Sequence, residues 1–406
     1  MRISMVSEHS NPLASLGESG AGGQNLFVAE LSAALTRSGC EVTVYTRRDD
    51  PAQPVRVVAD AGYRVVHVPA GPATRLPKEE LPPYMPRFTR WLRNDWRRRR
   101  PDLVHAHFWM SGLAALSATR GLGVPVLQSF HALGVVKRRH FGRADASPPQ
   151  RIPGERHIGH HATGVVASCS SEAAELTAMG VSPERLSVVP CGVDTDLFRP
   201  GRGHGEPRRF RHRLVAVGRL VPHKGFEKSI RVLAQLPDTE LVIAGGPPEA
   251  ELAADPEARR LRAVALRHGV ADRVRFVGQT DRDRLPGLLC DADLLLCTPW
   301  YESFGIVPLE AMACGVPVVA EAVGGLTDSV EDQVTGLLVP GGRVEDLALA
   351  VTRLSRDPAT RNRMGRSGRQ RVLSRYTWDR VARETLAVYR RSRPASPDLV
   401  ATGSPG

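Results

Sequence analysis

Two cations follow an apolar, β-branched run in the second half of the chain. The run ends at Gly218, and Arg219 and Lys224 lie in the segment RLVPHKG that comes next. Two fixed cations just past the end of a strand can neutralise a diphosphate in a way that one cation cannot. The Walker pattern GxxxxGK[ST] does not occur here, so the segment is not typical of a P-loop.

Two carboxylates flank the start of a predicted helix further along the chain. In the segment WYESFGIVPLE, Glu302 precedes the helix that begins near Gly305, and Glu310 lies within it. The first N–H groups of such a helix can bind an anion, while one carboxylate holds sugar hydroxyls and the other holds ribose hydroxyls. Each carboxylate alone could be structural, as a capping group or a surface charge. Because the two carboxylates occur together with Arg219 and Lys224, a ligand site explains these four residues better than separate structural roles.

A glycine pair and two histidines stand out in the first half. Gly22 and Gly23 come before a predicted helix, and paired glycines let a ligand approach the backbone closely, although they are also typical of flexible loops. The segment is not GxGxxG, which gives no support to a nicotinamide site. His105 and His107 alternate onto one face of a strand, but zinc needs three or four ligands and no third is apparent. We therefore expect no metal.

Short apolar runs alternate with longer amphipathic stretches, which is typical of βαβ units and parallel sheets. The predicted strands are 3–6, 42–45, 65–68, 103–107, 124–129, 164–167, 186–189, 214–217, 241–244, 274–277, 294–297, 318–320 and 337–339. The predicted helices are 24–37, 86–99, 111–119, 171–178, 226–235, 257–268, 284–290, 305–313, 326–331, 344–355, 359–376 and 378–391.

The pattern of elements is interrupted once, by a stretch rich in Gly, Pro and Arg. This predicts an α/β protein with two doubly wound, Rossmann-like domains and a cleft between them, because ligands bind beyond the carboxyl ends of such strands. The predicted parts are a first domain over 1–198, a linker over 199–212, a second domain over 213–376, a helix over 377–393 that crosses back, and a disordered tail over 394–406.

Composition narrows the class of partner. The 406 residues carry 55 basic and 43 acidic side chains, a net charge of +12, which favours anionic partners. Aromatic residues do not interleave with the basic ones, so nucleic acid is not expected. No run of residues is long and apolar enough for a membrane span, and six cysteines without a CxxC pair favour free thiols in the cytoplasm.

The segment that joins Glu302 to Glu310 across seven residues, with the following AMACGVPVVA, resembles the signature of glycosyltransferase family 4. The resemblance continues through Gly22–Gly23, DLVHAH, SFH and VPCGVD, and so spans nearly the whole chain. It implies a retaining, metal-independent enzyme without a cofactor and with the GT-B fold. In this fold two facing domains bind the acceptor and the nucleotide sugar respectively, and the last helix crosses back to the first domain.

The resemblance also implies roles for single residues. Arg219 and Lys224 would hold the donor diphosphate above Gly23, Glu310 would bind the ribose, and His131 would lie beside the transferred sugar. The catalytic residues implied are His131, Glu302, Arg219 and Lys224. The donor-binding residues implied are Gly23, Arg219, Lys224, Glu302, Ser303, Phe304, Gly305, Ile306 and Glu310. The acceptor-binding residues implied are Asn25, Lys78, Phe108, His131 and Arg151.

Within the family, the first half resembles the inositol-phosphate N-acetylglucosaminyltransferases of mycothiol biosynthesis. In that group a lysine, a tyrosine, a threonine and an arginine hold the acceptor phosphate. Lys78 and Arg151 match the two cations, whereas Phe108 and Ala132 replace the two hydroxyl donors. A phosphorylated acceptor is therefore one of several that the sequence leaves open.

The expected reaction moves a sugar from a nucleotide-diphosphate sugar, with UDP favoured, to a hydroxyl of a small acceptor of inositol, inositol phosphate or aminocyclitol type. Three alternatives stay open: a nucleotide-sugar epimerase, a non-catalytic sugar-binding or anion-binding protein, and a transferase that acts on a lipid-linked acceptor at an anionic membrane surface. A homodimer is a further expectation.

Overall fold

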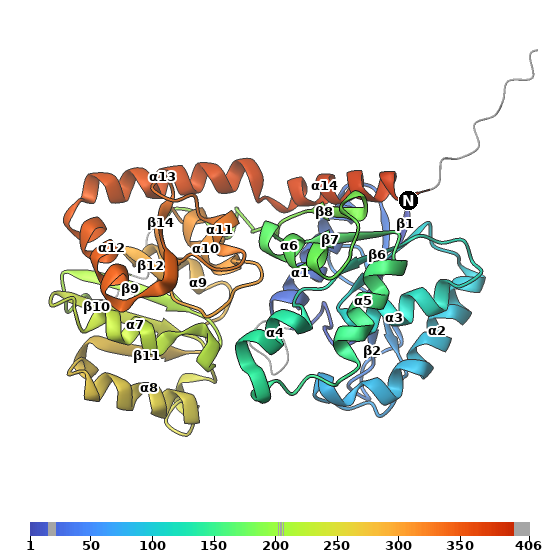
Figure 1. Cartoon of the computed structure of the whole chain (residues 1–406), viewed down its shortest axis with the longest axis horizontal. Coiled ribbons are helices and arrows are strands. Elements are labelled where there is room, and N and C mark those ends of the chain that lie inside the picture. Colours follow the sequence, from blue (N-terminus) through green and yellow to red (C-terminus); the bar gives the residue numbers. More distant parts are fainter. Residues whose placement is uncertain (15–21, 202, 204, 206, 394–406) are drawn as a thin grey trace, which may run out of the picture.

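The computed structural model describes residues 1–14, 22–201, 203, 205 and 207–393, and shows two α/β units, each built on its own sheet (Figure 1). The predicted tail over 394–406 lies outside the described residues. The first sheet has the order β3-β4-β2-β1-β5-β6-β7-β8 and the second the order β11-β10-β9-β12-β13-β14. Neighbouring strands are parallel except β3 and β4.

The strands of the first sheet are β1 (Arg2–Val6), β2 (Glu41–Arg47), β3 (Arg56–Val58), β4 (Arg64–Val68), β5 (Leu103–His107), β6 (Val126–Ser129), β7 (Gly164–Ala167) and β8 (Leu186–Val188). Its helices are α1 (Gly23–Arg37), α2 (Met85–Arg98), α3 (Trp109–Thr119), α4 (Gly134–Phe141), α5 (Arg151–His161) and α6 (Ser170–Ala178).

The strands of the second sheet are β9 (His212–Val217), β10 (Thr239–Ala244), β11 (Val274–Gly278), β12 (Leu294–Cys297), β13 (Val318–Glu321) and β14 (Gly336–Val339). The helices that follow in this half are α7 (Phe226–Leu233), α8 (Pro256–Arg267), α9 (Leu285–Cys290), α10 (Ile306–Ala313), α11 (Leu326–Ser329), α12 (Val344–Arg356), α13 (Pro358–Arg375) and α14 (Trp378–Arg391). Short 3-10 turns lie at Lys78–Glu80, Pro82–Tyr84, Gly142–Ala144, Pro183–Arg185, Pro222–Lys224, Glu249–Glu251, Ala271–Arg273 and Pro340–Gly342.

Both sheets reverse their strand order beside their first strand. In the first sheet β1 lies between β2 and β5, and in the second β9 lies between β10 and β12. A crevice forms at the carboxyl ends of the strands at such a switch point, and ligands of doubly wound folds bind there. The loops after β1, β5, β6, β9 and β12 carry most of the residues that the sequence predicts for the site.

Helix α14 belongs to the core of the first domain although it follows the second in the chain. Trp378, Val381 and Tyr389 are buried in one hydrophobic cluster with Phe27 and Leu31 of α1. In Figure 1 α13 runs along the second domain and α14 continues along the first. The apolar face of α14 thus ties the end of the described chain to the first domain, because its burial there removes apolar surface from water.

The sequence predicts the existence and type of most elements but misses β3, α4 and α5. Helix α5 has the sequence RIPGERHIGHH, in which a proline and two glycines obscure the helical pattern. The glycines allow close packing: a Cβ at Gly159 would lie 2.7 Å from Val181 Cγ2, and one at Gly154 would lie 3.2 Å from the Trp109 ring. Tertiary packing therefore decides this helix.

None of the helices in the described part of the chain is long and apolar enough to cross a membrane.

Candidate active site

The loops after β9 (residues 218–225) and after β12 (residues 298–305) are joined backbone to backbone. Gly225 has φ of 71°, and a Cβ there would lie 1.8 Å from the carbonyl oxygen of Thr298, so only glycine fits. Thr298 Oγ1 donates to the Gly225 carbonyl at 2.8 Å. The Trp300 N–H donates to the His223 carbonyl at 2.9 Å. This close approach places Lys224 beside Glu302.

Lys224 and Glu302 form a half-buried ion pair across these two loops. The distance from Lys224 Nζ to Glu302 Oε2 is 2.6 Å, and the other carboxylate oxygen accepts the Phe304 N–H at 3.4 Å. Burial acts to raise the pKa of the Glu302 carboxyl, but the Lys224 ammonium and the N–H groups of Phe304 and Gly305 together lower it. Glu302 is thus held as a carboxylate, and Lys224 is held beside the N-terminus of α10.

Arg219 lies in the same loop with an exposed side chain. Within the part of the chain that the structure describes, its guanidinium has no hydrogen-bond or ion-pair partner. An unpaired arginine beside a paired lysine leaves a net positive charge at this end of the second sheet. The arrangement can bind a diphosphate.

Glu310 lies deeper, on the buried face of α10. Its Oε1 is 3.3 Å from Arg282 Nη1, and Arg282 also lies 4.0 Å from Glu30 on α1 of the first domain. Burial raises the pKa of the Glu310 carboxyl to about 7, although Arg282 acts to lower it. Arg282 could not be predicted from the sequence alone, because no local pattern connects it to α10.

His131 follows β6 at the boundary with the second domain. It has φ of 62°, an uncommon conformation for a residue with a side chain. Its ring centroid is 5.3 Å from that of Phe27 and 5.4 Å from that of Phe304, which comes from the other domain. His131 Nε2 lies 2.9 Å from His107 Nδ1. Burial lowers the pKa of His131 to about 3, so the ring is neutral.

Phe108 follows β5 and lies between two cations. Lys78 Nζ is 5.6 Å from the ring centroid, and Arg151 Cζ is 5.0 Å from it, so both are within cation–π range. Burial lowers the pKa of Lys78, and the positive charges of Lys137, Arg151 and Arg219 lower it further against the effect of Glu79. Cations of both domains therefore act on one another here.

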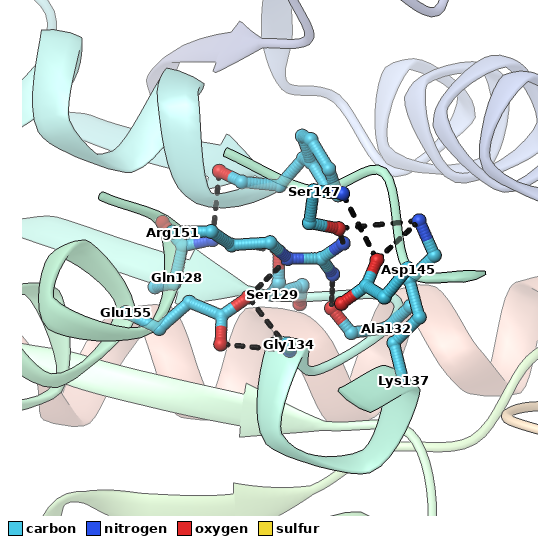
Figure 2. A network of polar contacts seen from close by, with 10 residues as sticks. Gln128, Ser129, Ala132, Gly134, Lys137, Asp145, Ser147, Arg151 and Glu155 are labelled. Carbon is cyan, nitrogen blue, oxygen red and sulfur yellow. Dashed lines mark hydrogen bonds and ion pairs between the residues drawn. The ribbon is translucent and has the colours of Figure 1, made fainter. Parts of the chain in front are cut away.

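Arg151 is the centre of a buried polar network (Figure 2). Its Nε donates to Glu155 Oε1 at 2.8 Å, Nη1 donates to Ser147 Oγ at 3.1 Å and Nη2 donates to the Ala132 carbonyl at 2.6 Å. Glu155 also accepts the Gly134 N–H with both carboxylate oxygens, at 3.0 and 2.8 Å. The network fixes the loop after β6, which carries His131.

A cavity of about 340 Å³ opens in the first domain at the carboxyl ends of β1 and β2. Asn25 lines it, with Oδ1 accepting the Gly22 N–H at 3.1 Å and Nδ2 donating to the Asn11 carbonyl at 2.9 Å. Glu8 and His9 line it too, and Glu8 Oε1 is 2.8 Å from His9 Nδ1. This pair is not among the residues predicted from the sequence, although its position directly after β1 is a usable signal.

Contacts between the domains bring further predicted residues together. Ser168 Oγ donates to the Ser303 carbonyl at 3.2 Å, and the Ser170 N–H donates to Asp328 Oδ2 at 2.5 Å. A Cβ at Gly23 would lie 3.4 Å from Ile306 Cδ1. The first turn of α1 therefore faces the first turn of α10.

Two family descriptions together cover most of the chain. Residues 21–197 match the model described as Glycosyltransferase Family 4, and residues 208–371 match the model described as Glycosyl transferases group 1. A D-inositol 3-phosphate glycosyltransferase of Kribbella flavida is 38% identical, over 96% of this chain and 95% of that protein. The chain belongs to the glycosyltransferase family that these descriptions define. One of Jonesia denitrificans is 37% identical over 97% of both chains.

Solved structures agree with the architecture. A sucrose-phosphate synthase of Thermosynechococcus elongatus has a TM-score of 0.87 and 32% identity, over 96% of this chain and 98% of that one. Anabaena Alr3699/HepE in complex with UDP and glucose has a TM-score of 0.72 and 20% identity, over 96% and 99%. The family resemblance, the GT-B fold and the glycosyltransferase activity predicted from the sequence are confirmed, and the roles of single residues stay predictions.

Among the described residues of the glycosyltransferase, no group of three or more His, Cys, Asp or Glu side chains could hold a metal ion. The structure brings His105, His107 and His131 together in a row of rings, here called the histidine stack. The rings of His105 and His107 are tilted, with centroids 4.3 Å apart, and those of His107 and His131 are stacked, with centroids 5.1 Å apart.

Proposed function

We propose that this glycosyltransferase moves a sugar, with retention of configuration, from a nucleotide-diphosphate sugar to a hydroxyl of a small cyclic polyol. We favour a UDP-sugar as the donor and an inositol phosphate as the acceptor, with free inositol and aminocyclitols as the related class. The D-inositol 3-phosphate glycosyltransferases that match nearly the whole chain support this choice.

The observation that carries the proposal is a pair of cations without ion-pair contacts at the domain boundary. Lys78 of the first domain and Arg219 of the second act on one another electrostatically, and neither has an ion-pair partner among the described residues. An unpaired, half-buried ammonium is costly, and an anionic group of a ligand would relieve the cost. A diphosphate on Arg219 and an acceptor phosphate near Lys78 would satisfy both.

The proposed reaction proceeds on one face of the sugar. The bond from the anomeric carbon to the leaving phosphate oxygen breaks, and a bond to the acceptor oxygen forms on the same face. The acceptor proton passes to the leaving phosphate oxygen. Arg219, Lys224 and the first N–H groups of α10 would stabilise the charge that develops on the diphosphate. Glu302 is paired with Lys224, which favours a binding role over that of a nucleophile, and the proposal needs no metal or cofactor.

The test is a competition between free and phosphorylated inositol, after a screen of UDP-, GDP- and ADP-sugars has identified the donor. We expect the native enzyme to prefer the phosphate. A Phe108→Tyr/Ala132→Thr variant adds two hydroxyl donors, and each hydrogen bond to a charged group contributes about 1.5–3 kcal/mol. The preference should therefore increase at least tenfold. Equal use of both acceptors by the native enzyme would contradict the proposed acceptor.

A further inference from the structure

The ring nitrogen that carries the proton can be assigned for each member of the histidine stack, His105, His107 and His131. At one end, Ser129 Oγ donates to the Val166 carbonyl at 3.0 Å, because a carbonyl can only accept. The lone pairs of Ser129 Oγ then accept a hydrogen bond from His105 Nε2, which lies 3.0 Å away. His105 thus carries its proton on Nε2, and its Nδ1 accepts from the hydroxyl of Tyr389 at 2.7 Å.

His107 is assigned in the same way from its other neighbour. His107 Nε2 lies 3.1 Å from the Met5 thioether sulfur, which has no proton to donate. The N–H of His107 therefore points to the sulfur, and Nδ1 keeps its lone pair. Since His107 Nδ1 is 2.9 Å from His131 Nε2, the proton between the two rings belongs to His131.

The assignment holds because the rings are neutral. All three are buried, and burial lowers the pKa of each imidazole. A neutral His131 with its proton on Nε2 has a bare lone pair on Nδ1. That atom is buried and has no hydrogen-bond partner within the described part of the chain. Such an atom is costly unless a ligand supplies the missing donor.

We propose that Met5 and His107 are positioning residues, which fix His131 in the Nε2–H tautomer so that Nδ1 accepts a hydrogen bond from a hydroxyl of the transferred sugar. The inference rests on the proposed function, because the sugar supplies that hydroxyl. The contact of His131 with Phe304 from the loop after β12 places the ring beside the region proposed for the nucleotide sugar. Neither Met5 nor His107 needs to touch the ligand.

The tautomer can be measured on the free protein by nitrogen NMR of the histidine rings. We expect an unprotonated Nδ1 in His131. His107→Asn keeps an acceptor at the position of Nδ1 and should preserve this tautomer. His107→Phe keeps a ring but has no acceptor, and Met5→Leu removes the sulfur; both should allow the other tautomer to appear. Tyr389→Phe, at the far end of the stack, is the control and should change nothing at His131. A protonated Nδ1 in the native protein would overturn the proposal.

Donor analogues test the direction of the hydrogen bond. A deoxyfluoro sugar can accept a hydrogen bond but cannot donate one, whereas a deoxy sugar does neither. At one ring position we expect both analogues to lower kcat/KM alike, by about twofold to tenfold. His107→Phe should lower kcat/KM by a similar factor with the native donor. With either analogue modified at that ring position, His107→Phe should cause no further loss.

Two results would count against the idea in different ways. A fluoro analogue that restores full activity at every position where the deoxy analogue loses it would show that His131 donates, and would overturn the tautomer assignment. Absence of turnover with every nucleotide sugar would overturn the proposed function, while the NMR result on the free protein would still report whether Met5 and His107 set the tautomer.

Discussion

The two faces of the site are built differently. On the face of the second domain, Arg219, Lys224 and Glu302 lie on two short loops, and their side chains are exposed or half-buried. On the face of the first domain, the Arg151–Glu155 pair and the histidine stack are buried and connect elements that are far apart in the chain. The first arrangement leaves charge available for a ligand, whereas in the second most polar groups hold the protein itself, with Lys78 and His131 Nδ1 as the exceptions.

This difference predicts where a mutation should act. Removing a charge from the second domain should impair the reaction and leave the fold intact, because exposed ion pairs contribute little stability. Removing one from the first domain should first destabilise the protein, because a buried partner is left uncompensated.

The largest effect is expected for Glu155→Ala. The substitution leaves the buried Arg151 guanidinium without its carboxylate, and breaking a buried pair in this way costs about 3–5 kcal/mol. Chemical denaturation should show this loss. Glu175→Ala is the matched control, since Glu175 pairs with an exposed Arg139, and it should cost less than about 1 kcal/mol. Equal losses in the two variants would show that burial of the Arg151–Glu155 pair adds nothing to its contribution to stability.

Arg219→Ala and Lys224→Ala should each lower turnover about a hundredfold to a thousandfold, because each removes a group that stabilises the leaving diphosphate. The midpoint of thermal unfolding should stay close to that of the native enzyme. Arg259→Ala removes an exposed arginine of α8 and should leave turnover unchanged. If both site variants turned over at the native rate, the donor site would have to lie elsewhere.

Glu310→Ala should weaken binding of the bare nucleoside diphosphate, whereas Glu302→Ala should mainly impair use of the whole sugar donor. Each substitution removes hydrogen bonds to a carboxylate, which contribute about 1.5–3 kcal/mol. Calorimetry with the nucleotide alone, followed by kinetics with the sugar donor, separates the two roles. The roles are reversed if Glu302→Ala loses the bare nucleotide more severely than Glu310→Ala does.

The last prediction concerns pH. The pKa of Glu310 is raised to about 7 in the folded protein from an ordinary value of 4.5. Between these values the folded state binds more protons than the unfolded state, so the contribution of Glu310 to stability is present below 4.5 and is lost as pH rises through 7. Glu310→Gln should flatten this part of the profile of unfolding free energy against pH, and Glu345→Gln, on the exposed face of α12, should not. An unchanged slope in Glu310→Gln would show that Glu310 is ionised throughout.

The repeated α/β pattern, the two-domain fold and the family could all be predicted from the sequence alone. The apolar runs of β1, β5 and β12 and the segment from Glu302 to Glu310 are contiguous, so each can be identified without knowing what packs against it. The residues of the second-domain face could be predicted for the same reason, since Arg219, Lys224 and Glu302 follow directly after the strands that position them.

Only the tertiary structure decided what pairs with these residues. Arg282 reaches Glu310 from another segment, and the register of β5 with β6 brings His107 to His131. Helix α5 forms despite its proline and glycines, because Gly154 and Gly159 pack closely in the folded protein and Arg151 pairs with Glu155. Local propensity extends over a few residues, whereas burial and pairing depend on segments far apart in the chain, such as Tyr389 and His105, which are 284 positions apart. The physical state of the first-domain face, with neutral histidines and a compensated arginine, is therefore a property of the packed protein.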